Sequence, residues 1–109
     1  MTKNFMVRQG DVLVVAVTST PKGVTPVDRE NGRAVLAHGE LTGHAHAIAD
    51  KGATLFCDPK FNAMFLAVGG NAPVALNHDE HDTINIPPGN YHVIRQREYS
   101  PEAIRNVED

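Results

Sequence analysis

Apolar residues in this chain occur in short runs, and most of these runs are rich in β-branched residues and bounded by glycine, proline or asparagine. The clearest run is residues 11–18, Asp-Val-Leu-Val-Val-Ala-Val-Thr, which is apolar on both faces of an extended chain. Such a pattern predicts a strand that lies centrally in a sheet or beneath a covering layer. Further strands are expected at residues 24–27, 33–38, 44–50, 53–57, 62–68, 73–78 and 90–99. Segment 62–68 is also compatible with a short helix, but we favour a strand.

Turn-forming residues separate these segments and indicate how they connect. Asn31-Gly32 ends a hydrophilic stretch and is typical of a β-hairpin, and Lys51-Gly52 predicts a tight turn that makes 44–50 and 53–57 partner strands. Ser100-Pro101-Glu102 predicts a short helical turn near the C-terminus. Because no predicted helix is long enough for a parallel crossover, the sheet should be antiparallel. We therefore predict one all-β domain over residues 1–109, a small antiparallel β-barrel or sandwich.

Composition narrows the class of protein. The chain has 109 residues, of which 41% are hydrophobic, as expected for one folded domain. Its longest strongly apolar run, Val12 to Val17, is far shorter than the ~20 residues that cross a bilayer. A single cysteine, Cys57, fits a reducing compartment. The first residues show no signal-peptide pattern, so we expect a cytoplasmic protein without a membrane partner. Net charge is −3 and basic residues are not clustered, which disfavours nucleic acid as a partner. A small molecule and a homodimer are the partners we expect.

The candidate chemistry lies in the six histidines, at positions 38, 44, 46, 78, 81 and 92. His44 and His46 are two residues apart, so on a strand both rings project from one face and can converge on one ion. Neutral imidazole is the commonest metal ligand near neutral pH. Asp50 continues the same face and could supply an oxygen. His78 and His81 are three residues apart, so they reach one ion only if the polar segment around them turns.

The segment Gly-Glu-Leu-Thr-Gly-His44-Ala-His46, followed by Pro87-x-Gly89-x-x-His92, resembles the two motifs of the cupins. The resemblance covers roughly residues 36–95. It implies a small β-barrel in which His44, His46 and His92 hold one divalent metal, with Asp50 where a glutamate is usual. The region after His78 also resembles a group of small bacterial and phage proteins, which implies no activity.

Two ligand sets follow from these patterns. The cupin resemblance implies His44, His46 and His92, whereas local density joins His44 and His46 to His78 and His81. Zinc, iron, manganese and nickel all suit nitrogen and oxygen ligands. A coordination position left to water would allow metal-dependent chemistry on a small molecule, so the sequence leaves open whether the protein is an enzyme. The alternative is a non-catalytic binding or assembly module whose histidines are structural.

Overall fold

A computed structural model describes residues 5–38 and 44–95 of the chain, and these residues form ten β-strands and no helix. The strands are β1 (Met6–Gln9), β2 (Val12–Val17), β3 (Thr25–Pro26), β4 (Ala34–His38), β5 (Ala45–Ile48), β6 (Ala53–Asp58), β7 (Ala63–Val68), β8 (Val74–Asn77), β9 (Ile84–Ile86) and β10 (Gly89–Arg95).

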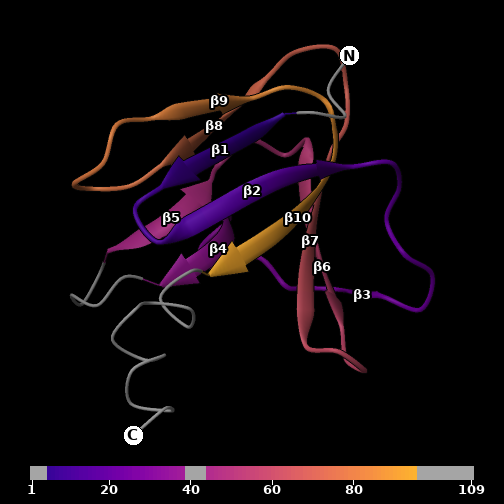
Figure 1. The fold of residues 1–109 in the computed structure, drawn as a ribbon. Coiled ribbons are helices and arrows are strands. Elements are labelled where there is room, and N and C mark those ends of the chain that lie inside the picture. Colours follow the sequence, from indigo (N-terminus) through magenta and orange to yellow (C-terminus); the bar gives the residue numbers. More distant parts are fainter. Residues whose placement is uncertain (1–4, 39–43, 96–109) are drawn as a thin grey trace, which may run out of the picture.

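The strands build two sheets (Figure 1). The six-stranded sheet has the order β1-β2-β10-β7-β6-β3, and the four-stranded sheet has the order β4-β5-β8-β9. Every pairing between strands is antiparallel. The prediction of an all-β, antiparallel fold is therefore confirmed. Over the described ranges the strand pairings form two separate sheets and no closed barrel.

The core lies between the inner faces of the two sheets. In β2, fully buried residues alternate with half-buried ones, so one face of this strand points into the core. β2 lies between β1 and β10, which confirms the prediction of a strand with neighbours on both sides. One continuous apolar cluster combines residues of both sheets. Its fully buried members include Val14 and Leu66 from the six-stranded sheet and Ile48 and Leu76 from the four-stranded sheet.

The predicted pairing of segments 44–50 and 53–57 is wrong, because the chain changes sheets between them. β5 pairs with β4 and β8, whereas β6 pairs with β7 and β3. The turn itself is present: the Gly52 amide donates to Asp50 Oδ1 at 2.7 Å. The Arg29 guanidinium reinforces the turn by donating to the carbonyl oxygens of Ala49 and Ala53, at 3.0 and 2.9 Å.

The Asn31-Gly32 turn is also present, but its hairpin does not extend. Both residues have positive φ, 54° and 77°, and the Arg33 amide donates to the Glu30 carbonyl at 3.0 Å. Beyond this single bridge the chain separates, since β3 joins the six-stranded sheet and β4 the four-stranded one. A turn signal specifies the local reversal of the chain, and the core decides which strands then pair.

Residues 63–68 form a strand, as favoured over the helix. Two further strands, β1 and β9, were not predicted, because both are short and their neighbours in the sequence are polar. The helical turn expected at Ser100-Pro101-Glu102 lies outside the described residues. Across the part of the chain that the structure describes, we find no helix with the length and apolar character to span a membrane.

The alternation of buried and half-buried positions predicts unequal effects of truncating two leucines. Leu66 on β7 is fully buried, whereas Leu13 on β2 points away from the core and is half-buried. We expect Leu66→Ala to lower the free energy of unfolding by about 2–5 kcal/mol because it leaves a cavity. Leu13→Ala should cost less than about 1.5 kcal/mol. Urea unfolding of both variants measures the difference, and equal losses would contradict the described core.

Candidate functional site

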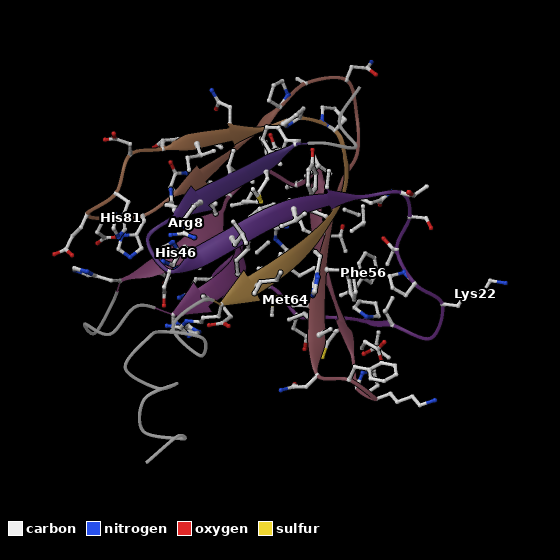
Figure 2. All side chains as sticks on the ribbon, viewed as in Figure 1. Arg8, Lys22, His46, Phe56, Met64 and His81 are labelled. Carbon is white, nitrogen blue, oxygen red and sulfur yellow. The ribbon has the colours of Figure 1, made fainter. Side chains whose placement is uncertain are left out.

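Three segments that are distant in sequence meet at one end of the two sheets. They are the β1–β2 turn at residues 9–11, the start of β5 at residues 44–46, and the β8–β9 connection at residues 78–83. The first belongs to the six-stranded sheet and the other two to the four-stranded sheet. Figure 2 shows His46 and His81 together at this end, away from Phe56.

Four of the five predicted metal ligands lie in this region, which we call the histidine cluster: His44, His46, His78 and His81. The ring centroids of His46 and His78 are 4.3 Å apart, those of His78 and His81 4.7 Å, and those of His46 and His81 5.9 Å. The His44 ring lies 5.8 Å from that of His78. His44 and His46 thus both contact one ring, as expected for residues that share a face.

His46 is the buried member of the cluster, and Gln9 holds it. Both side chains are 2% exposed. The Gln9 amide nitrogen donates to the carbonyl oxygens of Leu76 and Asp82, each at 2.9 Å, so the amide oxygen is the atom that faces His46 Nδ1, at 2.8 Å. Because that oxygen can only accept, His46 carries its proton on Nδ1. In the neutral ring, Nε2 therefore keeps a free electron pair.

Asp11 faces this free nitrogen, with its Oδ1 3.4 Å from His46 Nε2. Burial opposes ionisation of Asp11, but its hydrogen bond with Arg95 (3.1 Å) and the charge of that guanidinium prevail, so the pKa of the carboxyl is lowered. Burial, followed by the nearby His78, lowers the pKa of His46. Near neutral pH a carboxylate and an imidazole electron pair thus face each other, an arrangement that attracts a cation.

The β8–β9 connection turns, which brings His78 and His81 to the same region despite their spacing of three. The Glu80 amide donates to His78 Nδ1 at 3.0 Å, so this ring nitrogen is already occupied. His81 is exposed and lies against Gly10, which has φ +60°. A Cβ atom built on Gly10 would lie 2.7 Å from His81 Nε2 and 3.2 Å from His46 Cε1. A side chain at position 10 would therefore require the His81 ring to move, and the positive φ of Gly10 favours glycine independently of that space.

Two acidic residues lie at the outer edge of the cluster, next to His44. The two ring nitrogens of His44 are 3.9 Å from Asp79 Oδ2 and 4.0 Å from Glu80 Oε2. Both carboxylates are more than half exposed, at 56% and 60%. Water therefore weakens their attraction for the ring.

The fifth predicted ligand, His92, lies elsewhere. Its ring stacks on Phe65 with centroids 4.9 Å apart, and no ring contact in residues 5–38 and 44–95 joins it to His44 or His46. Asp50, the predicted oxygen donor, instead accepts from the Gly52 amide. The structure thus assembles the set expected from local density and does not bring together the set that the cupin resemblance implies.

The cluster gathers imidazoles without orienting them all toward one point. Among the described residues, no three histidine, cysteine, aspartate or glutamate side chains are arranged to hold a metal ion as they stand. His78 Nδ1 is engaged by a backbone amide, and the exposed His81 ring lies against Gly10. Rotation of at least one ring has to precede coordination by three donors.

Gln9 and Asp11 were not among the residues predicted from the sequence. A Gly-Asp pair between short apolar runs, at residues 10–11, is a hairpin signal that could have located the β1–β2 turn. Nothing in the sequence connects that turn with His46, since the hydrogen-bonded pair Gln9 and His46 is separated by 37 positions.

His92 makes stability depend on pH. Burial lowers its pKa below the usual 6.5, so the unfolded chain binds a proton that the folded protein excludes. Neutral His92 therefore contributes to the free energy of unfolding. Its contribution is complete above pH 6.5 and is lost as the pH falls from 6.5 through the pKa of His92 in the folded protein. The slope is at most about 1.4 kcal/mol per pH unit for one proton. We expect His92→Phe, which retains a ring against Phe65, to have a flatter dependence in urea unfolding with a chelator present. An unchanged slope would show that His92 titrates alike in both states.

Comparison with known proteins identifies a family and no function. No curated protein and no solved structure matches the chain. Residues 8–96 match a family described as a domain of unknown function, DUF8820, and this range contains the whole histidine cluster together with Gln9 and Asp11. Since the match spans most of the chain, the protein belongs to the DUF8820 family.

Proposed function

We propose that this protein binds a divalent metal ion at the histidine cluster. The observation that carries the proposal is the meeting of His46, His78 and His81, from two separate segments, around the buried and hydrogen-bonded His46. Each imidazole has two ring nitrogens, and a nitrogen that is buried needs a hydrogen-bond partner. Histidines with a purely structural role therefore gain nothing from lying in contact with one another. Three rings in contact at the end of a domain favour a shared ligand.

The spacing of the rings supports this proposal. Two imidazoles bound to one ion at about 2.1 Å hold their ring centroids about 5 Å apart. The three separations here, 4.3, 4.7 and 5.9 Å, lie around that value. Small rotations of side chains, rather than movement of strands, would therefore bring the donor atoms into place. His46 is the ligand with the fixed position, because it lies on β5 and its ring is hydrogen-bonded to Gln9. The exposed His81 ring is the one that would rotate.

The chemistry of the surroundings also favours a cation. Asp11, Asp79, Glu80 and Asp82 all lie in or beside the segments that form the cluster. Because His81 and the residues next to it are exposed, an ion bound here would be reached from solvent. A water ligand could then be exchanged for a small molecule, on which the metal would act as a Lewis acid.

Metal binding can be tested with zinc. We expect the purified protein to bind one Zn²⁺ per chain in isothermal titration calorimetry, and to carry metal in elemental analysis when purified without chelators. The double variant His78→Ala/His81→Ala should bind at least about 100-fold more weakly, because it removes imidazoles from a nitrogen and oxygen site. Both positions lie outside the strands and neither is buried, so the fold should tolerate the change.

The matched control is His92→Ala, which removes an imidazole outside the cluster. It should retain the affinity of the natural protein, and retention of metal in this variant would separate the cluster from the cupin ligand set. Failure of the natural protein to bind Zn²⁺, Ni²⁺, Co²⁺ or Mn²⁺ would refute the proposal and leave the histidines with a structural role. Equal binding by the double variant would place the ion elsewhere.

A further inference from the structure

We infer that the ion lies between His46 Nε2 and Asp11 Oδ1 in a four-coordinate, tetrahedral site, with His81 as the third protein ligand. This inference rests on the proposed function and goes beyond it, since it assigns Asp11, selects His81 over His78 and specifies the geometry. It also gives roles to two neighbouring residues. Gln9 keeps the proton of His46 on Nδ1 so that Nε2 can bind the ion, and Arg95 competes with the ion for Asp11.

Gln9 determines which ring nitrogen of His46 is free to bind a metal ion. Its amide nitrogen is committed to two backbone carbonyls, those of Leu76 and Asp82. Reversing the amide would place its oxygen 2.9 Å from each of two other oxygens. The Gln9 oxygen therefore accepts from Nδ1–H of His46 at 2.8 Å, and Nε2 is left as the ligand atom. Residues of this kind behind a metal-bound imidazole fix its tautomer and its orientation.

The distance between the two donor atoms indicates the geometry. Two ligands at about 2.1 Å from an ion are about 3.4 Å apart in a tetrahedral site and about 3.0 Å apart in an octahedral one. His46 Nε2 and Asp11 Oδ1 are 3.4 Å apart. These two atoms thus already span one edge of a tetrahedron, the geometry that zinc adopts with nitrogen and oxygen ligands.

His81 is the third ligand because of where its ring lies. A Cβ atom built on Gly10 would lie 2.7 Å from His81 Nε2 and 3.2 Å from His46 Cε1, so the His81 nitrogen and the His46 ring lie beside the same residue. Gly10 is next to Asp11 in the chain. His81 is exposed, so its ring can rotate at little cost. His78, in contrast, accepts from the Glu80 amide through Nδ1, so its neutral ring carries the proton on Nε2 and would have to give up this hydrogen bond before either nitrogen could bind the ion. The fourth position remains for water.

Arg95 opposes the ion. Its Nε atom donates to Asp11 Oδ2 at 3.1 Å, so the guanidinium neutralises the carboxylate that faces His46. A divalent ion on Oδ1 is repelled by this charge, and removing the charge should strengthen binding. Arg95 also donates to the His38 carbonyl, so its place does not depend on Asp11 alone.

Cobalt(II) tests the geometry, because four-coordinate Co²⁺ absorbs visible light far more strongly than six-coordinate Co²⁺. We expect titration of the natural protein with Co²⁺ to produce the intense spectrum of a tetrahedral site. Asp11→Asn and His81→Ala should each weaken Co²⁺ binding by at least about 100-fold, whereas His78→Ala should change it less than tenfold.

Arg95→Gln is the matched control for Asp11→Asn, since both variants break the same ion pair. If Asp11 only supported the fold, both changes would weaken binding alike. Because we assign Asp11 as a ligand and Arg95 as its competitor, Arg95→Gln should bind Co²⁺ several-fold more tightly than the natural protein. Weaker binding in both variants would overturn the assignment, and thermal unfolding of each variant would show whether it folds.

A measurement on the unmodified protein tests the role of Gln9. Nitrogen-15 NMR of the metal-free protein above pH 7 should show His46 protonated on Nδ1 and not on Nε2, and Zn²⁺ should shift the Nε2 resonance. Protonation on Nε2 instead would overturn the inference. Co²⁺ binding with a six-coordinate spectrum, unaffected by Asp11→Asn, would also overturn it while leaving the proposed function intact. Absence of any Co²⁺ or Zn²⁺ binding would refute both.

Discussion

The hydrogen bond between Gln9 and His46 ties the two sheets together at the end where the histidines gather. Gln9 ends β1 in the six-stranded sheet, and His46 lies on β5 in the four-stranded sheet. Both side chains are buried, and a buried polar group that lacks a partner costs about 1–3 kcal/mol. The Gln9 amide meets this demand with three contacts at 2.8–2.9 Å, to His46, Leu76 and Asp82. His78 and His81 lie beside an imidazole that is buried and hydrogen-bonded to Gln9.

This constraint gives the end of the domain an unusual electrostatic character. An ionised Asp11 and the electron pair of His46 face each other, while Arg95 balances the carboxylate from the other side. Further out, Asp79 and Glu80 add negative charge beside His44. The histidines alone would repel a cation once protonated, but together with these carboxylates they form a region that favours one. We propose that a divalent metal ion is that cation.

The fold was largely predictable at the level of single strands and poorly predictable at the level of pairing. Residues 12–17 and 63–68 form strands because their β-branched and apolar side chains suit an extended, buried chain. The Asn31-Gly32 and Lys51-Gly52 turns are also where the sequence predicts them, yet neither joins two paired strands. Both lie where the chain passes from one sheet to the other, and this passage depends on how the apolar faces cover each other.

The sequence by itself determined the all-β class, most of the strand positions and the common face of His44 and His46, because alternation and turn chemistry act over a few neighbouring residues. Only the tertiary structure decided which imidazoles meet. His92 is within a motif that suggests a shared site, but its strand packs the ring on Phe65, while the turn after β8 brings in His78 and His81. Likewise, Asp11 and Gln9 gain their importance from contacts with His46 across 35 and 37 positions of the chain. Such contacts follow from the packing of the two sheets, which no local pattern of residues encodes.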